Sequence, residues 1–320
     1  MAGEQRQAAL ARALEWAREQ TFEGAAYDAG RIAELKRDQQ VSVVIPVKEA
    51  ALTVGRVAAS CLRLQDAGAV DEVLVIDADS EDGSAEFAAQ AGAQVHQEAD
   101  LLADHGPVHG KGDALWRSLT VADGDIVVFV DSDTEGFSEA FVCGLVGPLL
   151  EHEELQLVKG AFDRPFTSAG VRIEGGGGRV NELVARPLLN TYFPELAAVR
   201  QPLAGELAAR RDALIAVPFR TGYGVEIALL IDFYTRFGLE AIAQSDLGER
   251  LNRHQHLHEL APMAFAVQRA LLDRVELLPE GALPGDEFLG YVDGEPEVRS
   301  IPAFERPPLA SIGVEAARGA

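Results

Sequence analysis

The sequence predicts an α/β protein built on a mainly parallel β-sheet. Three short apolar stretches rich in β-branched residues, at residues 41–46, 71–76 and 126–130, have the composition of buried strands. Stretches with helical periodicity, at residues 51–64, 85–91 and 113–121, alternate with them. Strands and helices in this order form βαβ units, whose strands pair in parallel.

The remaining chain is expected to be more helical and less regular. Helices are predicted at residues 4–20, 181–190, 225–237 and 260–278, with an interruption near Pro187, and a short strand at 93–96. Pro and Gly recur from Pro279 onward, which indicates an extended tail. We divide the chain into an N-terminal helical segment (1–40), a first half of the α/β unit (41–155), a second half (156–260) and a C-terminal helix with its tail (261–320).

Composition excludes several classes of function. The 320 residues carry a formal charge of −23, whereas a broad nucleic-acid surface needs clustered Lys and Arg. Residues 1–20 lack the apolar core of a signal peptide, and no uncharged apolar stretch approaches the roughly 20 residues that span a bilayer. We therefore expect no membrane partner and a cytoplasmic location. Any phosphate site must be local, built from a few cations or backbone amides.

Two aspartates directly follow the most hydrophobic predicted strand, in the motif Asp131-Ser132-Asp133. Ligands of parallel sheets bind beyond the carboxyl ends of the strands. There, two carboxylates one residue apart can approach one hard cation, which takes its oxygen ligands from carboxylate and phosphate together. The same pattern occurs by chance in solvated loops, but its position after a buried strand favours a metal–diphosphate site.

Two further motifs should face the same crevice. Residues 77–79 (Asp-Ala-Asp) end the preceding strand and can accept hydrogen bonds from a base or ribose, while Asp82 or Ser84 can cap the next helix. Residues 110–112 (Gly-Lys-Gly) offer a lysine between glycines that permit close backbone approach to phosphate; the alternative is a plain turn.

The second half of the chain holds three candidate ligand-binding motifs. Residues 175–181 join four glycines to Arg179 at a helix start, which is either an anion site or a flexible loop. Residues 222–226 place Glu226 in a first helical turn, where it either orients an acceptor or complements the helix dipole. Histidines at 254, 256 and 258 form either a metal-ligand group or a surface cluster.

Four blocks in this order resemble the retaining glycosyltransferases that make glucosyl-3-phosphoglycerate and mannosyl-3-phosphoglycerate on a GT-A fold. They are residues 111–119 (KGDALWRSL), 124–133 (GDIVVFVDSD), 178–188 (GRVNELVARPL) and 222–227 (GYGVEI). The similarity covers about residues 40–260. It implies hexose transfer from a sugar nucleotide to the C2 hydroxyl of D-3-phosphoglycerate, with retention of configuration, by a metal-dependent enzyme.

The resemblance also implies a role for each candidate residue. The sugar nucleotide would contact Pro46, Val47, Glu49, Ala78, Lys111, Asp131, Ser132, Gly205 and Glu206. The acceptor 3-phosphoglycerate would contact Gly178, Arg179, Asn181 and Tyr223. Catalysis would rest on Lys111, Asp131, Asp133 and Glu226, and Mg²⁺ or Mn²⁺ would be bound by Asp133 and His254.

Three departures from the glucosyl-forming pattern bear on the donor. Asn181 stands where those enzymes have Thr, and the turn at 47–50 is less acidic than theirs. In addition, His254, the first histidine of the group at 254–258, lies two residues beyond the position of the expected metal ligand. His254 therefore serves either the metal or the acceptor. Asn is also scarce in the chain, as in heat-adapted proteins or in proteins encoded by GC-rich genomes. We therefore expect mannose from GDP-mannose as the transferred sugar, with UDP-glucose as the alternative donor.

Two other classes of function are weaker alternatives. A nucleotidyltransferase would need a Gly-rich triphosphate loop after the first strand, where this chain has residues 46–49 (Pro-Val-Lys-Glu). A sugar-nucleotide sensor without catalysis would not consume its donor. The apolar second-half helices and the tail are compatible with a homodimer.

Overall fold

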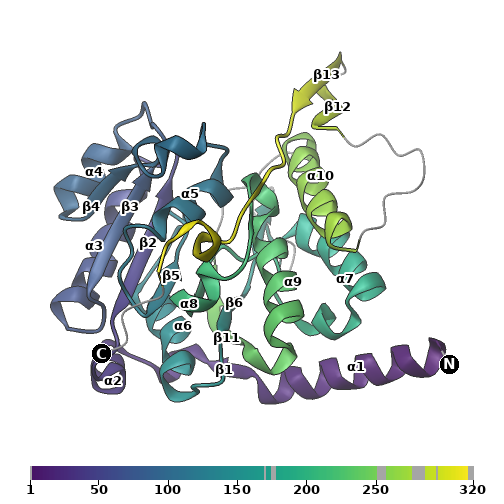
Figure 1. Ribbon diagram of the computed structural model, residues 1–320, viewed down its shortest axis with the longest axis horizontal. Coiled ribbons are helices and arrows are strands. Elements are labelled where there is room, and N and C mark those ends of the chain that lie inside the picture. Colours follow the sequence, from purple (N-terminus) through teal and green to yellow (C-terminus); the bar gives the residue numbers. More distant parts are fainter. Residues whose placement is uncertain are drawn as a thin grey trace.

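The computed structural model describes residues 2–168, 171–173, 178–250, 257–275, 285–292 and 295–315. Its centre is an eight-stranded sheet (Figure 1). In spatial order the strands are β1 (Thr21–Glu23), β11 (Ile242–Glu249), β6 (Leu157–Asp163), β9 (Leu207–Arg210), β5 (Ile126–Phe129), β2 (Val41–Val47), β3 (Glu72–Asp77) and β4 (Gln94–Gln97). Every pairing is parallel except those of β9, which runs antiparallel to β5 and β6. The predicted α/β class and mainly parallel sheet are confirmed.

Helices cover both faces of the sheet. One face packs against α2 (Ala29–Lys36), α3 (Val54–Asp66), α4 (Ser84–Ala91) and α6 (Glu139–Glu151). The other packs against α1 (Ala2–Glu19), α5 (Lys111–Ser118), α7 (Arg186–Tyr192), α8 (Arg211–Ile215), α9 (Val225–Phe237) and α10 (Leu257–Arg274). Side chains alternate between the two cores, as Val43 and Val44 of β2 do, because successive strand residues point to opposite faces. Apolar residues on both faces explain why the strands read as continuous hydrophobic runs.

Strands of the second half were missed by the sequence analysis. β9 has the sequence Leu-Ala-Ala-Arg, and alanine is a poor strand former. It is nonetheless a strand because it fills the space between β5 and β6 and exchanges ladder hydrogen bonds with both. The predicted helix at 181–190 begins as a π-helical turn at Asn181–Ala185 and continues as α7.

The C-terminal segment is extended, as expected, but it is bound along much of its length. After the hairpin of β12 (Glu287–Val292) and β13 (Glu295–Ser300), it runs back across the front of the molecule (Figure 1). Its strand β14 (Glu305–Arg306) pairs with β10 (Phe219–Arg220), and Pro307 O accepts a 2.8 Å hydrogen bond from Trp116 Nε1. The segment therefore connects α5 to the start of α9.

The predicted division into four segments stays a prediction. β1, from the first segment, pairs with β11, and the short pair β7 (Phe166–Ser168) and β8 (Val171–Ile173) lies apart from the main sheet.

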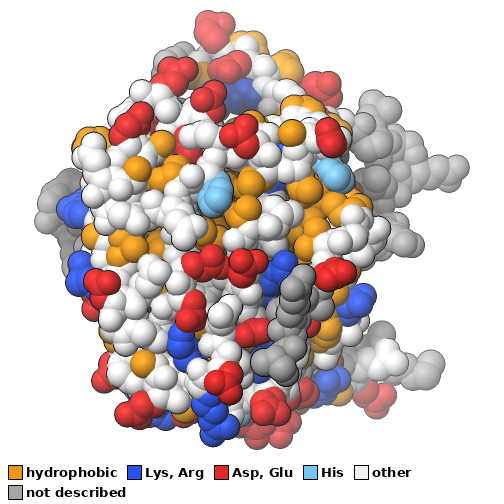
Figure 2. Space-filling model, turned by 60° about the vertical axis from the view of Figure 1, so that its left-hand side comes forward, with side chains coloured by type: hydrophobic (Ala, Val, Ile, Leu, Met, Phe, Trp, Pro, Cys, Tyr) orange, Lys and Arg blue, Asp and Glu red, His pale blue; other side chains and the backbone are white. Residues whose placement is uncertain are grey.

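Acidic side chains are scattered over the face shown in Figure 2, which has no broad basic area. Among the described residues, no helix combines the length and apolarity needed to cross a membrane.

Candidate active site

A cavity of about 680 Å³ opens beyond the carboxyl ends of β2, β3 and β5. Twelve of the predicted site residues line it: Pro46, Val47, Ala78, Lys111, Asp131, Ser132, Asp133, Gly178, Arg179, Asn181, Tyr223 and Glu226. Glu49, Gly205 and Glu206 lie outside its lining, and His254 lies outside the described residues. The tertiary structure thus brings motifs from both halves of the chain to one cavity.

At the centre of the cavity, Lys111 joins two carboxylates. Its Nζ lies 2.5 Å from Asp131 Oδ1 and 2.8 Å from Glu226 Oε1. Burial disfavours the charge of Lys111, but Asp131 and Glu226 outweigh this and hold the lysine pKa above its usual range. The lysine is therefore a fixed cation.

Arg250 completes the ion-pair network from the other side. Its Nη2 lies 2.7 Å from Asp131 Oδ2, and its Nη1 lies 2.8 Å from Glu206 Oε2. The second Glu206 oxygen accepts a 3.1 Å hydrogen bond from Thr134. Burial opposes ionisation of Asp131, yet Lys111 and Arg250 hold the pKa of Asp131 below its usual range. Asp131 is therefore held by cations on both oxygens.

Gly205 makes this network sterically possible without lining the cavity itself. A Cβ at this position would overlap Asp131 Oδ1 and Lys111 Nζ. Only glycine leaves room for the lysine–aspartate pair. The sequence signal for this requirement is slight, because Gly205 stands alone in an ordinary loop.

Asp133 differs from Asp131 in being accessible. Its side chain is 72% exposed, and its nearest described cation is Arg250, 3.7 Å away. An exposed carboxylate that lines this cavity suits a hard cation that shares its other ligands with a diphosphate. Among the described residues no group of three or more acidic, Cys or His side chains could hold a metal alone. The donor set therefore fits a metal that is bound jointly by Asp133 and a ligand.

One end of the cavity is formed by the turns after β2 and β3. Lys48 Nζ bridges these turns by donating to Ala78 O at 2.8 Å and to Asp79 O at 2.9 Å. The Glu49 carboxylate accepts a 2.9 Å hydrogen bond from Glu81 N, so Glu49 supports the turn. Pro46, Val47 and Ala78 remain as the lining of this end.

Asp82 and Ser84 also join these two turns. Asp82 Oδ2 accepts from Ala51 N at 2.9 Å, and Ser84 Oγ accepts from Ala50 N at 2.8 Å. The N-cap residue of α4 is Gly83, which makes no side-chain capping hydrogen bond. Asp82 Oδ1 nevertheless accepts a 3.0 Å hydrogen bond from Ser84 N, the first backbone amide of α4. The expectation that Asp82 or Ser84 caps α4 is therefore met by Asp82, whereas the Ser84 hydroxyl is used to fix the neighbouring turn.

The glycines beside Lys111 serve packing. A Cβ on Gly112 would overlap Arg220 O, and one on Gly110 would lie 3.4 Å from the Cα of Gly222. Gly110 also has a φ of +73°, which favours glycine. The two glycines let the start of α5 lie against residues 219–225, and this contact positions Lys111 beside Glu226.

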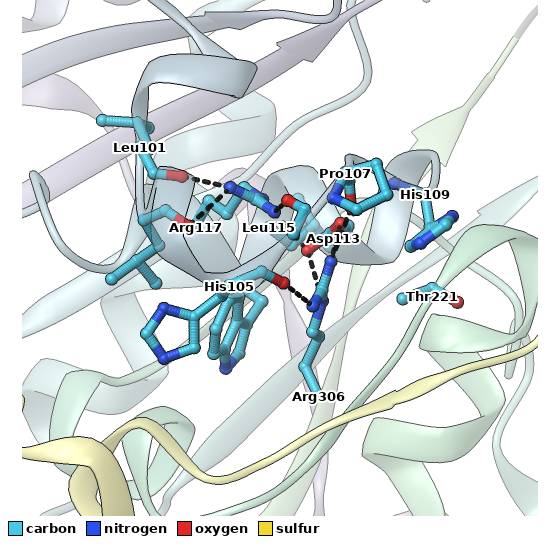
Figure 3. A network of polar contacts seen from close by, with 12 residues as sticks. Leu101, His105, Pro107, His109, Asp113, Leu115, Arg117, Thr221 and Arg306 are labelled. Carbon is cyan, nitrogen blue, oxygen red and sulfur yellow. Dashed lines mark hydrogen bonds and ion pairs between the residues drawn. The ribbon is translucent and has the colours of Figure 1, made fainter.

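Asp113 anchors the loop that precedes α5 (Figure 3). Its buried carboxylate accepts from His109 N at 2.9 Å, from Arg117 Nε at 3.2 Å and from Arg306 Nη2 at 2.7 Å. The guanidinium groups of Arg117 and Arg306 also donate to carbonyl oxygens along residues 101–107. A loop without regular strands is thereby held in one conformation.

The opposite end of the cavity holds the predicted anion site. Gly178 has a φ of +69°, and Arg179 and Asn181 follow it into the π-helical turn. Asn181 is buried, and its Oδ1 accepts a 3.3 Å hydrogen bond from Leu203 N. Of the four consecutive glycines at 175–178, the first three lie outside the described residues, as do His254 and His256. His258 is exposed in the first turn of α10.

Four charged residues near this cavity were missed by the sequence analysis: Arg250, Arg164, Glu98 and Lys159. Arg250, Arg164 and Glu98 line the cavity. Lys159 is buried and donates a 2.6 Å hydrogen bond to Ala204 O. Burial lowers the pKa of Lys159 to about 8. Arg164 packs 4.9 Å from the Phe162 ring centroid. Lys159 lies in β6 and Arg250 directly follows β11, and neither strand was predicted. Recognising the two strands would have pointed to these cations, because ligands bind near the carboxyl ends of strands.

The sheet is mainly parallel, and beyond the carboxyl end of β5 it carries the exposed Asp133 beside Asp131, whose two oxygens are both ion-paired. This arrangement is that of a GT-A glycosyltransferase. Residues 42–183 match the model of glycosyl transferase family 2. A glucosyl-3-phosphoglycerate synthase of Mycolicibacterium smegmatis is 41% identical over 297 residues, covering 93% of this chain and 98% of that protein. The same enzyme of Petrotoga mobilis is 41% identical over 87% of this chain and 88% of its own. The chain belongs to the glucosyl-3-phosphoglycerate synthase family.

Solved structures agree with this assignment. A mannosyl-3-phosphoglycerate synthase from Rubrobacter xylanophilus superposes with a TM-score of 0.86 at 40% identity, covering 93% of this chain and 99% of that one. A glucosyl-3-phosphoglycerate synthase from Mycobacterium tuberculosis, in complex with Mn²⁺, UDP-glucose and phosphoglyceric acid, gives 0.80 at 41% identity over 89% and 95%. The predicted GT-A fold and family are confirmed.

Proposed function

We propose that this protein transfers a hexose from a sugar nucleotide to the C2 hydroxyl of D-3-phosphoglycerate, with retention of the α-configuration. The observation that carries the proposal is one cavity that is lined both by Pro46 and Ala78, after β2 and β3, and by Gly178 and Arg179, the predicted anion site. The Lys111–Asp131–Arg250 network lies between them. This order matches donor, reacting bond and phosphorylated acceptor.

UDP-glucose is the donor we propose first. The curated relatives with 41% identity are glucosyl-3-phosphoglycerate synthases, and a related structure contains UDP-glucose. The mannose preference expected from the sequence is not confirmed. GDP-mannose stays the second candidate because a mannosyl-3-phosphoglycerate synthase is structurally similar at a TM-score of 0.86.

Asp133 is the residue we assign to the metal, Mn²⁺ or Mg²⁺, together with diphosphate oxygens. When bound, such an ion supplies Lewis-acid neutralisation of charge on the diphosphate. The support on this chain is the exposure of the Asp133 carboxylate and the engagement of both Asp131 oxygens by cations. The second ligand expected at His254 stays a prediction, and a related structure contains Mn²⁺.

Retention is best explained by a displacement on one face of the sugar. Among the described residues, the three carboxylates around Lys111 and Arg250 are ion-paired: Asp131 and Glu226 to Lys111, and Glu206 to Arg250. Of the other carboxylates in the cavity lining, Asp133 is assigned to the metal and Glu98 lies beside Ala78. Ion pairing weakens a carboxylate as a nucleophile. In the proposed step, the bond from C1 to the diphosphate oxygen breaks and a bond from C1 to the acceptor oxygen forms. The hydroxyl proton passes to the departing diphosphate.

The test is a donor panel with the purified full chain. UDP-glucose, GDP-glucose, ADP-glucose and GDP-mannose are each incubated with 3-phosphoglycerate and Mn²⁺, and the product's anomeric configuration is read by NMR. An α-glucosyl product from UDP-glucose supports the first proposal, and an α-mannosyl product from GDP-mannose the second. A β-linked product, or no product from any donor, contradicts the proposed function.

The homodimer expected from the sequence is a separate proposal. The β12–β13 hairpin packs on α10 through Phe288 against Phe265, yet it exposes Leu289, Tyr291 and Val298, which a second copy of the chain could cover. Light scattering of the purified chain measures its mass directly. A monomer at micromolar concentration contradicts this expectation and leaves the proposed reaction untouched.

A further inference from the structure

Glu98 is a buried carboxylate with no role in the network around Asp131. It begins the 3₁₀ turn Glu98–Asp100, directly after the edge strand β4. Its side chain is 1% exposed, and it lines the cavity. Neither of its oxygens has a hydrogen-bond partner among the described residues. A buried carboxylate without donors is costly and calls for a ligand that supplies them.

The cations near Glu98 are committed to other acceptors. Arg117 and Arg306 donate to Asp113 and to carbonyl oxygens of residues 101–107 (Figure 3), while Lys48 donates to Ala78 O and Asp79 O. Burial, and then repulsion by Asp113, raises the pKa of Glu98 to about 7 despite these cations. The carboxyl group therefore remains available for a donor that enters the cavity.

Glu98 lies at the nucleoside end of the cavity. Gln97, the residue before Glu98, pairs with Asp77, the residue before Ala78, so Glu98 and Ala78 lie next to each other in the cavity lining. Pro46, Lys48, Val108 and Gly110 also line the cavity. The phosphates and sugar are assigned to the other residues, near Lys111 and Asp133. The group left to meet Glu98 is the edge of the base.

We propose that Glu98 is a specificity-determining residue that accepts the ring N–H of the donor nucleobase, and so selects uracil or guanine over cytosine and adenine. Uracil carries a hydrogen at N3 and guanine at N1, whereas the matching nitrogens of cytosine and adenine are acceptors. A carboxylate that faces this ring nitrogen accepts a hydrogen bond from uracil and guanine but meets a lone pair in cytosine and adenine, whose nearest donor is the exocyclic amino group beside it. This inference rests on the proposed function, because it requires a nucleotide in the cavity.

The chemistry predicts a clear effect of Glu98→Gln. The glutamine amide offers both a donating NH₂ group and an accepting oxygen, so it can pair with the ring nitrogen of uracil and of cytosine alike. Sites that hydrogen-bond a ligand group discriminate strongly against an analogue that lacks it. Replacing the carboxylate should therefore relax selection between bases rather than abolish nucleotide binding.

The experiment is calorimetric binding of UDP, CDP, GDP and ADP to the full chain with Mn²⁺ at about pH 8, where Glu98 is mainly ionised. In the wild type we expect UDP to bind at least about tenfold more tightly than CDP. If the protein binds GDP, we expect GDP to bind more tightly than ADP by a similar factor. In Glu98→Gln the UDP-to-CDP ratio should fall to within about threefold. Asp100→Asn is the matched control: it removes a charge from an exposed residue of the same turn and should keep the wild-type ratio.

The outcomes separate the two proposals. Equal binding of UDP and CDP by the wild type overturns the inference, and so does an unchanged ratio in Glu98→Gln. The wild-type comparison stands even where the variant fails to fold. A wild type that binds none of the four nucleotides contradicts the proposed function itself.

Discussion

The guanidinium of Arg306 reaches the carboxylate of Asp113 across 193 residues of chain, with Nη2 2.7 Å from Oδ2. Through this pair the C-terminal segment fixes the loop that lines the nucleoside end of the cavity. Arg306 is not among the residues that line the cavity, so it is a positioning residue (Figure 3).

Arg306→Ala should lower the free energy of unfolding by about 2 kcal/mol, because it removes hydrogen bonds to a buried charge. The donor KM should rise about tenfold while kcat changes less, since the loop shapes the donor site. Urea unfolding and steady-state kinetics measure both. Arg306→Lys should restore part of the loss, because lysine keeps the positive charge but lacks the planar guanidinium group.

Arg299→Ala, which breaks an exposed pair with Glu297, is the control. An unchanged donor KM in Arg306→Ala argues against the positioning role.

Gly205→Ala should reduce kcat at least about 100-fold, because small displacements of reacting groups have effects of this size. The added methyl group would overlap Asp131 Oδ1 and Lys111 Nζ and force the pair apart. Gly30→Ala is the matched control, since its Cβ would meet only Asp28 Oδ1 at an ordinary 3.5 Å. Near-normal turnover by Gly205→Ala would mean that the Lys111–Asp131 pair is dispensable.

Chelation of divalent metal should abolish turnover, and Mn²⁺ should restore it. Asp133→Ala should lower kcat at least about 100-fold at subsaturating Mn²⁺ and raise the Mn²⁺ concentration needed for half-activity, because it removes the assigned carboxylate ligand. The exposed Asp66→Ala serves as the charge-matched control. Full activity of Asp133→Ala with an unchanged Mn²⁺ response would remove Asp133 from the metal site.

Arg179→Ala should raise the KM for 3-phosphoglycerate by roughly 10- to 100-fold, the loss expected for hydrogen bonds to a charged ligand group. The KM for the donor should change little, because Arg179 lies at the opposite end of the cavity from Ala78. Arg236→Ala, exposed at the end of α9, controls for general loss of positive charge. An effect confined to the donor would refute the acceptor assignment.

Glu98 should make stability depend on pH. Burial raises its pKa from 4.5 to about 7, so the folded state retains a proton that the unfolded state has released. Stability from this group is fully present below about pH 4.5 and is lost as pH rises through about 7. Asp113, Arg117, Arg306 and Lys48 are the charged groups that face it. Between about pH 5.5 and 8 the wild type should lose about 2 kcal/mol relative to Glu98→Gln. Urea unfolding at both pH values checks this, and a constant difference would contradict it.

The amino-acid sequence determined the α/β class, the first three βαβ strands and the residues of the two cavity ends. These features rest on local information: buried parallel strands are continuous apolar runs, and ligand-binding carboxylates, glycines and cations directly follow strand or helix boundaries. Asp131, Lys111 and Arg179 could be found for this reason.

The tertiary structure alone decided which of these residues act together. β9 is a strand because it pairs with β5 and β6. Gly205 is required because Asp131 and Lys111 occupy the space that a side chain at this position would need. Arg250 meets Asp131 only because β11 and β5 belong to one sheet. Glu98 stands out only because the fold buries it and no hydrogen-bond partner for its oxygens lies in the described part of the chain. Contacts between distant segments and the desolvation of single groups have no local pattern in the sequence, because they depend on how the whole chain packs.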